Sequence, residues 1–300
     1  MFRLAAAPIT WGVCELPDWG EVPSPSRVLD EMAAAGFAGT ELGSPGFLPT
    51  DPAALQRELA ARRLALVGAF YPVAFHQPDG AAQSLEEAIR FAGFLAEAGC
   101  ERLIAADAGD ERRRAIAGRV TAQDRLPGDA WHRFGETLGR LAERCARLGL
   151  QVCFHPHAGT YVETTGELDA LLAATPETVG LCLDTGHIAY GGGDPVAVCR
   201  KYAARVWHVH AKDVRPDLLA RVRGEGIDYS TAVGLGVFAP LGAGMVDFPA
   251  LLDTLHRAGY DGWYVLEQDV RLGPPWPPQD PLANAQRSIA YLRRQLAATT

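Results

Sequence analysis

Two short apolar runs that end abruptly in polar residues most constrain the fold of this chain. Residues 179–183, VGLCL, stop at Asp184, and residues 206–209, VWHV, stop at His210. A nearly continuous apolar strand is typical of a parallel sheet covered by helices, because only such a sheet buries both faces of a strand. The polar residues that follow are therefore expected at the carboxyl ends of parallel strands, away from ordinary surface.

The rest of the chain repeats this alternation. Eight units can be read, each a short β-rich stretch followed by a helix with apolar residues at helical spacing. Ser24 or Ser26 can cap the first helix, Gly36 can end it, and Asp51 with Pro52 predicts the start of the second. Eight alternations predict a parallel sheet, and eight strands close a barrel. We therefore predict an α/β fold, a single (β/α)8 TIM barrel over residues 1–300.

An open, doubly wound sheet is the alternative architecture. It is disfavoured because the chain lacks the glycine-rich turn after the first strand that would hold a dinucleotide. One connection, at about residues 214–244, is too long for a plain link between a strand and a helix. We expect it to form a lid or substrate loop over the active-site face.

Charge and cysteine content exclude several classes of protein. The net charge of -8 disfavours a nucleic acid or an anionic membrane as the partner, since these select basic surfaces. No apolar run approaches the roughly 18 residues of a membrane span. The six cysteines are scattered without a CxxC pair, which favours reduced thiols. We expect a cytoplasmic protein with a small-molecule partner, and a homo-oligomer stays open.

The residues at the expected strand ends are rich in metal ligands. They are Glu41, His155, His157, Asp184, His187, His208, His210, Lys212, Asp213, Glu267 and Asp269. Imidazoles with carboxylates suit Mn²⁺, Fe²⁺, Co²⁺ or Zn²⁺, and no thiolate is expected among them. Any one histidine taken alone is better explained as a hydrogen-bonded core or loop residue. Their coincidence with two acidic strand ends favours a metal site.

Other polar and aromatic candidates admit two interpretations each. Glu41 either contacts substrate or binds backbone amides of a neighbouring loop. Trp11 either stacks on a sugar at the barrel mouth or closes the core. Lys212 and Asp213 form either a structural ion pair or a functional group in which Asp213 orients Lys212 or His210.

Seven segments carry a family resemblance: PITWG, GFAGTELGS, HPHAGTYVET, LCLDTGHIAYGGGDP, WHVHAKDVR, GAGMVDF and GWYVLEQD. In order and spacing they resemble the xylose-isomerase-like TIM-barrel superfamily of sugar phosphate isomerases, epimerases and relatives of AP endonuclease family 2. Within it the chain is most similar to the inosose (2-keto-myo-inositol) dehydratase branch. The resemblance spans nearly the whole sequence.

The resemblance also implies a ligand set. The metal ligands of the superfamily fall on Asp184, His210 and Glu267, and His187 falls where relatives contact substrate. The ligand from the fifth strand is usually a glutamate in isomerases and epimerases, but this chain has His155 there. One of the two glutamates that act as acid and base in epimerases is thus missing. A histidine-rich fifth strand is similar to the dehydratase branch.

The implied activity is metal-dependent elimination of water from a cyclic keto-polyol through an enediolate, a lyase reaction. Mn²⁺ or Co²⁺ is the expected ion, with Zn²⁺, Fe²⁺ or Mg²⁺ as alternatives. Glu267 or His155 is the expected base, and His187 or Lys212 the expected acid. Expected substrate contacts are Trp11, Glu41, His157, His187 and Asp213.

Four other functions stay open at this point. A lyase acting on 3-keto sugars or C-glycosides would use the same metal chemistry. A ketose isomerase or epimerase would need Glu163 or Glu41 as a second base. A DNA-repair endonuclease would need a broad basic surface, which the acidic balance disfavours. A non-enzymatic sugar-binding protein would bind its ligand without metal.

Overall fold

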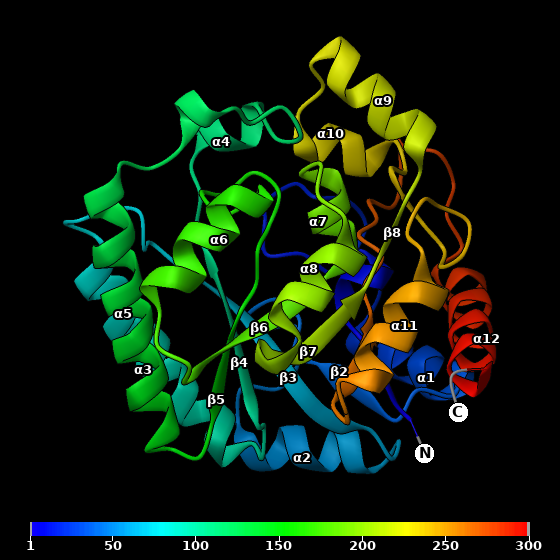
Figure 1. Ribbon diagram of the computed structural model, residues 1–300. Coiled ribbons are helices and arrows are strands. Elements are labelled where there is room, and N and C mark those ends of the chain that lie inside the picture. Colours follow the sequence, from blue (N-terminus) through cyan, green and yellow to red (C-terminus); the bar gives the residue numbers. More distant parts are fainter. Residues whose placement is uncertain (1, 299–300) are drawn as a thin grey trace.

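The computed structural model describes residues 2–298 and forms a closed barrel of parallel strands in the order β1-β10-β7-β6-β5-β4-β3-β2. The barrel strands are β1 Arg3–Ala6, β2 Gly39–Glu41, β3 Ala65–Val73, β4 Arg102–Asp107, β5 Gln151–Phe154, β6 Val179–Asp184, β7 Val206–Ala211 and β10 Trp263–Leu266. Helices surround the barrel, as Figure 1 shows. The predicted (β/α)8 barrel is confirmed.

The helices follow the strands as the alternation predicts. They are α1 Pro25–Ala35, α2 Pro52–Ala60, α3 Ala81–Glu97, α4 Glu111–Ala115, α5 Gly128–Ala146, α6 Thr165–Ala174, α7 Thr185–Tyr190, α8 Pro195–Tyr202, α9 Pro216–Glu225, α10 Tyr229–Gly234, α11 Phe248–Arg257 and α12 Pro281–Ala298. Three short 3-10 helices lie at Pro8–Trp11, Ala122–Asp124 and Ala203–Arg205. None of the described helices is long and apolar enough to cross a membrane.

Local sequence signals set several helix ends. The side chain of Ser24 accepts a hydrogen bond from the Arg27 amide at the start of α1, and Gly36 ends that helix with φ +90°. Asp51 caps α2 through the Ala54 amide at 2.7 Å. These caps satisfy backbone groups that the first and last helical turns leave free.

The largest core layer lies between the strands and the helices, whereas the barrel interior holds small apolar clusters. One interior cluster contains Ala5, Ala7, Val67 and Val265, and a second contains Ile104, Cys153 and Cys182. Above these clusters the interior becomes polar. The barrel core therefore forms a floor beneath the carboxyl ends of the strands.

The segment at residues 214–244 is ordered, with secondary structure of its own, rather than a plain loop. It holds α9 and α10, and β8 Asp213–Val214 pairs antiparallel with β9 Phe238–Ala239. Figure 1 shows α9 and α10 at the end of the barrel that also carries α4 and α7. We call residues 214–244 the excursion.

Candidate metal centre and its cavity

Strand register brings the predicted ligands to one level of the barrel. Asp184 on β6 lies opposite His210 on β7, and His210 lies opposite Val265 on β10. Side chains alternate along a strand, so Glu267, two residues beyond Val265, faces the same side. His155 directly follows β5. Neighbouring parallel strands thus deliver four potential ligands to the barrel interior.

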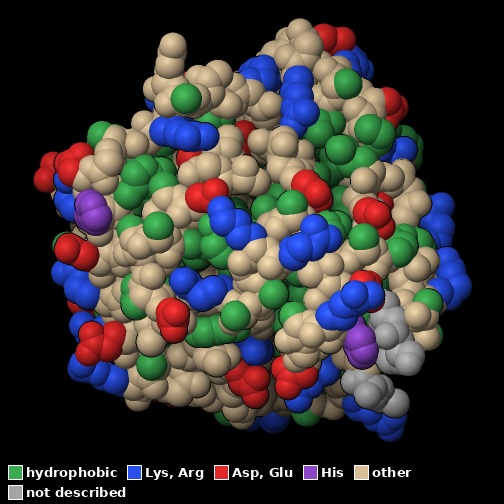
Figure 2. All heavy atoms as spheres, in the orientation of Figure 1, with side chains coloured by type: hydrophobic (Ala, Val, Ile, Leu, Met, Phe, Trp, Pro, Cys, Tyr) green, Lys and Arg blue, Asp and Glu red, His purple; other side chains and the backbone are tan. Residues whose placement is uncertain are grey.

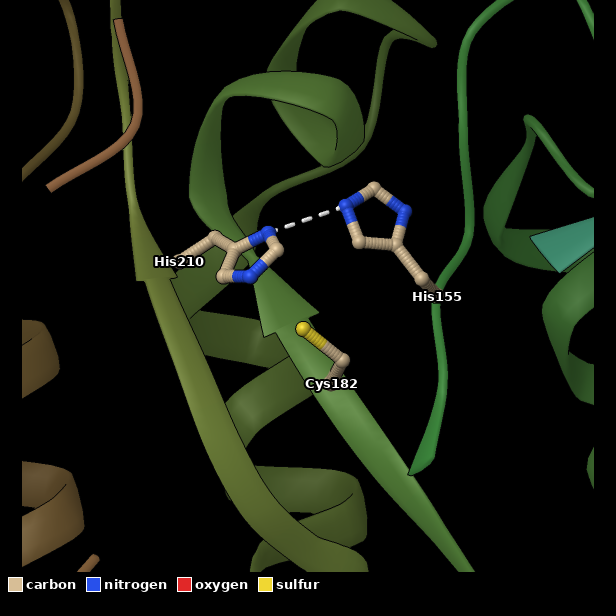
Figure 3. Close-up of side chains that lie close together, drawn as sticks. All are labelled: His155, Cys182 and His210. Carbon is tan, nitrogen blue, oxygen red and sulfur yellow. Dashed lines mark hydrogen bonds between the residues drawn. The ribbon is translucent and has the colours of Figure 1, made fainter. Parts of the chain in front are cut away.

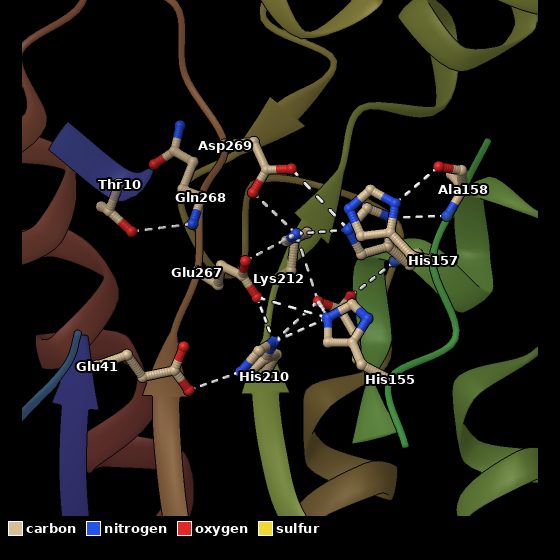
Figure 4. A network of polar contacts seen from close by, with 12 residues as sticks. Thr10, Glu41, His155, His157, Ala158, His210, Lys212, Glu267, Gln268 and Asp269 are labelled. Atoms are coloured by element: carbon tan, nitrogen blue, oxygen red, sulfur yellow. Dashed lines mark hydrogen bonds and ion pairs between the residues drawn. The ribbon is translucent and has the colours of Figure 1, made fainter. Parts of the chain in front are cut away.

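Four ligand atoms converge, and Figure 4 labels three of the residues that supply them, His155, His210 and Glu267. Each residue offers one ligand atom, and these four atoms lie within 4.8 Å of one another. The residues are His155, Asp184, His210 and Glu267. His155 Nε2 is 3.0 Å from His210 Nδ1, 3.4 Å from Asp184 Oδ2 and 3.9 Å from Glu267 Oε2. His210 Nδ1 is 3.5 Å from Asp184 Oδ2 and contacts Glu267 Oε2. We call these four residues the quartet.

The quartet suits a divalent cation. Asp184 Oδ2 and Glu267 Oε2 are buried atoms without a hydrogen-bond partner among the described residues. Glu41 and Asp269 add two more carboxylates nearby, and Lys212 is the single ammonium in this network. Buried carboxylates require compensating positive charge. Two imidazoles and two carboxylates suit Mn²⁺, Co²⁺ or Zn²⁺.

A thiol lies next to the quartet, although no thiolate was expected among the strand-end residues. Figure 3 shows Cys182 on β6 beside His155 and His210, and its sulfur lies within 4.8 Å of a nitrogen from each. Cys182 precedes Asp184 by two residues and shares its face of the strand. Burial raises the pKa of this thiol to about 11, so the neutral form dominates.

Glu41 binds two imidazoles and lines the cavity, so it does not bind the backbone amides of a neighbouring loop, and its contact with substrate stays a prediction. Its Oε1 lies 2.8 Å from His208 Nε2 and 2.8 Å from His210 Nε2. Burial alone would raise the pKa of Glu41, but the charge of His210 and hydrogen bonds from both histidines lower it to about 2. This carboxylate therefore binds His210 through Nε2, the ring nitrogen that does not face the quartet.

His157 faces the cavity, whereas His187 does not line it. His157 Nδ1 donates to the Ala158 carbonyl at 2.7 Å, and burial beside His155 and Lys212 lowers its pKa to about 3. His187 lies on α7, 1% exposed, and its Nδ1 accepts from the Ala158 amide at 3.2 Å. The expected direct contact of His187 with substrate is therefore not supported by its position.

Lys212 is enclosed by acidic groups. Its Nζ lies 2.8 Å from Asp269 Oδ1, 3.3 Å from Asp184 Oδ2 and 2.9 Å from His187 Nε2. Burial opposes its charge, but the neighbouring carboxylates raise the pKa of Lys212 above its usual value. The ammonium is 0% exposed and does not line the cavity.

Asp213 points away from the cavity, so its expected substrate contact is wrong, as is its expected ion pair with Lys212. Its carboxylate accepts four backbone amides at 2.9 to 3.0 Å, those of Val214, Gly242, Gly244 and Val246. A carboxylate with so many amide donors is a structural anchor. Asp213 joins the two ends of the excursion.

Trp11 closes the core and does not stack on a ligand. It is 0% exposed, its indole donates to Glu31 Oε2 at 2.7 Å, and it is not among the cavity residues. The tryptophan that lines the cavity is Trp19, whose indole donates to the Val270 carbonyl at 2.8 Å.

A cavity of about 380 Å³ opens above the quartet. Its polar wall includes Glu41, His155, His157, Glu267 and Asp269, and its apolar wall includes Trp19, Phe70 and Tyr71. Concave sites with an apolar wall and a few convergent polar groups are typical of small-molecule binding. Of the quartet, His155 and Glu267 face this space.

Tyr229 is one of several cavity residues that sequence reasoning missed, together with Glu15, Trp19, Phe70 and Tyr71. It begins α10 in the excursion and donates its hydroxyl to Asp269 Oδ2 at 2.5 Å. Its position in the sequence gives no strand-end signal. The length of the excursion was the only available indication that such a residue existed.

One face of the molecule shows how its charged side chains are distributed. On the face that Figure 2 shows, Lys and Arg side chains are interspersed with Asp and Glu and do not gather into one broad basic area. Nucleic-acid enzymes of this kind need such an area to hold phosphates.

The barrel fold and the cavity at its strand ends are typical of one class of small-molecule enzymes, and comparison with known proteins leads to the same class. The sequence matches the family described as xylose isomerase-like TIM barrel over residues 29–295, and the chain belongs to this family. It is 39% identical to the rhizopine catabolism protein MocC of Rhizobium meliloti, over 89% of this chain and 81% of that protein. It is 36% identical to the inosose dehydratase of Geobacillus kaustophilus, over 92% of this chain and 90% of that protein.

Solved structures show the same fold. The IolI protein, whose structure holds a zinc atom, superposes with a TM-score of 0.71 at 13% identity, covering 100% of this chain and 99% of that one. The resemblance to the inosose dehydratase branch is confirmed by the curated relatives of that name.

Proposed function

We propose that this protein is a metal-dependent dehydratase that eliminates water from a cyclic keto-polyol such as 2-keto-myo-inositol. The observation that carries the proposal is the quartet at the base of a cavity in a chain 36% identical to an inosose dehydratase. His155, Asp184, His210 and Glu267 would hold the cation. When bound, a divalent cation stabilises negative charge that develops on the ketone oxygen of the substrate.

The base is a group that faces the cavity. Elimination begins when a base removes the proton on the carbon beside the ketone. Glu267 and His155 both line the cavity and both stay candidates for this role. His157 holds its proton on Nδ1, toward the Ala158 carbonyl, which leaves Nε2 as an acceptor for a substrate hydroxyl.

The acid is better assigned to Asp269 with Tyr229 than to His187 or Lys212. The departing hydroxyl must gain a proton to leave as water. Asp269 and Tyr229 line the cavity and share a short hydrogen bond, whereas His187 and Lys212 are not among the cavity residues. Lys212 then acts behind Asp269, 2.8 Å from its Oδ1, as a fixed positive charge.

Mn²⁺ or Co²⁺ is the proposed ion. Two nitrogen and two oxygen ligands are intermediate between the oxygen sites of Mg²⁺ and the sulfur-rich sites of softer ions. We also propose a cytoplasmic location, which suits six cysteines that are all free. The homo-oligomeric state stays a prediction.

The ketose isomerase alternative lacks its second base. Glu163 accepts from the Gly118 and Gly159 amides at 2.7 Å each and does not line the cavity. Glu41 is held by His208 and His210. Neither glutamate that the isomerase would need is therefore placed as a free second base.

The decisive experiment is incubation of the Mn²⁺-loaded protein with 2-keto-myo-inositol, with formation of the diketone followed by its enone-type absorbance. We expect product with the wild type and with Glu163→Gln, and none with Glu267→Gln. Interconversion of ketoses without this absorbance would replace the dehydratase with an isomerase. Tight binding of sugar to chelator-treated protein without turnover would indicate a binding protein.

A further inference from the structure

Glu41 lies between two imidazoles, and only one of them belongs to the quartet. Its Oε1 is 2.8 Å from His210 Nε2 and 2.8 Å from His208 Nε2, and all three side chains are buried. Figure 4 shows Glu41 on the side of His210 that is remote from His155. The two ring nitrogens of His210 thus face different partners.

A carboxylate oxygen can only accept hydrogen bonds, so His210 Nε2 must donate to Glu41. The other nitrogen, Nδ1, contacts Glu267 Oε2 and lies 3.5 Å from Asp184 Oδ2. Without a cation both ring nitrogens therefore face carboxylates, and a cation held by the quartet would take the place of the Nδ1 proton, because a ligating imidazole is neutral. The hydrogen bond to Glu41 keeps the remaining proton on Nε2, so the lone pair of the neutral ring faces the quartet.

We propose that Glu41 is a positioning residue that fixes the tautomer and ring orientation of His210 for metal binding. The inference rests on the metal site of the proposed function, and it gives Glu41 a role other than that of a base. His208 completes the arrangement, because it donates to the same oxygen from the next inward position on β7. Carboxylates behind a ligating histidine raise its basicity and hold its ring.

The other histidine of the quartet has no such support. His155 Nδ1 is a buried nitrogen without a hydrogen-bond partner among the described residues. Cys182, beside both rings, offers only a neutral thiol. The structure therefore assigns His210 the role of fixed ligand, whereas the orientation of His155 depends on the quartet itself.

Metal affinity tests this role. Glu41→Gln keeps the size of the side chain but removes its charge, and we expect it to weaken Mn²⁺ binding by about 10- to 100-fold. Glu163→Gln is the matched control, since it changes another buried glutamate that touches no imidazole of the quartet. The control should bind Mn²⁺ within about twofold of the wild type. The same affinity in Glu41→Gln as in the wild type would overturn the proposal.

A spectroscopic measurement separates positioning from a merely structural role. In ¹⁵N-histidine spectra of the wild-type protein loaded with Zn²⁺, a diamagnetic probe, His210 should carry its proton on Nε2 and bind the ion through Nδ1. Signals are assigned to His210 by their loss in His210→Asn. A proton on Nδ1 would overturn the proposal. This measurement needs no Glu41 variant, so it tests the tautomer of His210 even when that variant does not fold.

The number of ions bound per chain tests a rival role, in which Glu41, His208 and His210 hold a second ion. We expect one Mn²⁺ per chain. Two ions per chain that fall to one in Glu41→Gln would overturn the positioning role.

An experiment on the metal-free protein separates this inference from the proposed function. There the Nε2 proton of His210 should exchange slowly with water in the wild type and rapidly in Glu41→Gln, even if no metal were ever bound. Equal exchange in both proteins would overturn the inference alone.

Discussion

Tyr229 donates its hydroxyl to Asp269 Oδ2 at 2.5 Å and so connects the excursion to the rim of the barrel beyond β10. Asp269 also faces Lys212, whose Nζ is 2.8 Å from its other oxygen. This chain of contacts places a hydroxyl, a carboxylate and an ammonium in sequence at the cavity wall. It is the basis of the first prediction.

Tyr229→Phe removes the hydroxyl and keeps the ring. We expect kcat/KM to fall by about 10- to 100-fold, because Asp269 loses its partner and the departing hydroxyl loses a proton source. Steady-state kinetics measures this effect. Tyr190→Phe is the control, since the Tyr190 hydroxyl is buried without a hydrogen-bond partner among the described residues. Equal activity in the two variants would remove Tyr229 from the reaction.

Asp213→Asn should destabilise the protein while leaving the cavity intact. Its amide nitrogen cannot accept the backbone hydrogen bonds that the lost oxygen accepts, and each orphaned buried donor costs about 1–3 kcal/mol. We expect the free energy of unfolding in urea to fall by about 2–4 kcal/mol. The KM of the folded fraction should stay unchanged. A raised KM at full stability would restore Asp213 as a substrate contact.

The two tryptophans should separate stability from binding. Trp11→Phe loses the hydrogen bond to Glu31 and should lower the free energy of unfolding by about 1–3 kcal/mol with no change in KM. Trp19→Phe alters the cavity wall and should raise KM. Unfolding curves and kinetics on both variants test this difference. The reverse pattern would make Trp11 the stacking residue.

Glu163 should make stability depend on pH. Burial raises its pKa from the usual 4.5 to about 7, so the folded protein holds a proton that the unfolded chain has lost between these values. Stability therefore falls as pH rises from 4.5 to 7, by on the order of 3 kcal/mol from this group. Urea unfolding across this range should show the loss in the wild type. The slope should be shallower in Glu163→Gln, and equal slopes would contradict the assignment.

Removal of the metal should abolish activity and reduce stability. With the cation gone, the carboxylates of Asp184 and Glu267 face each other across the quartet, and Lys212, which also pairs with Asp269, is the one ammonium near them. Dialysis against chelator should stop turnover, and added Mn²⁺ should restore it. At 100 times the dissociation constant, Mn²⁺ should add about 2.7 kcal/mol to the free energy of unfolding. Full turnover by protein shown to be metal-free would refute the metal site.

The barrel could be predicted from sequence because it follows from strand periodicity, whereas the quartet was singled out from the polar strand-end residues by the family resemblance. Apolar runs locate the strands, and parallel strands place their carboxyl ends at one rim. Asp184, His210 and Glu267 come together for this reason. The alternation of side chains along the strand could also have shown that Asp213 does not face the cavity. His208, His210 and Lys212 share one face of the chain, so Asp213, the next residue, faces the other way.

Contacts between distant segments could not be predicted in this way. Glu41 and His210 are 169 residues apart, and Tyr229 and Asp269 are separated by a segment with its own helices. Trp11 follows a short strand, but a 3-10 helix turns its side chain into the core. No local pattern encodes these orientations, because packing against remote residues decides them.

The four amide contacts of Asp213 have a consequence for how such enzymes diversify. One carboxylate clamps the entry of the excursion at Val214 and its exit at Gly242, Gly244 and Val246. The quartet lies outside that segment, whereas Tyr229 lies within it. Evolution, or an engineer, can therefore replace the excursion to alter substrate choice while the barrel keeps the quartet, provided that the new segment again offers a hydroxyl to Asp269.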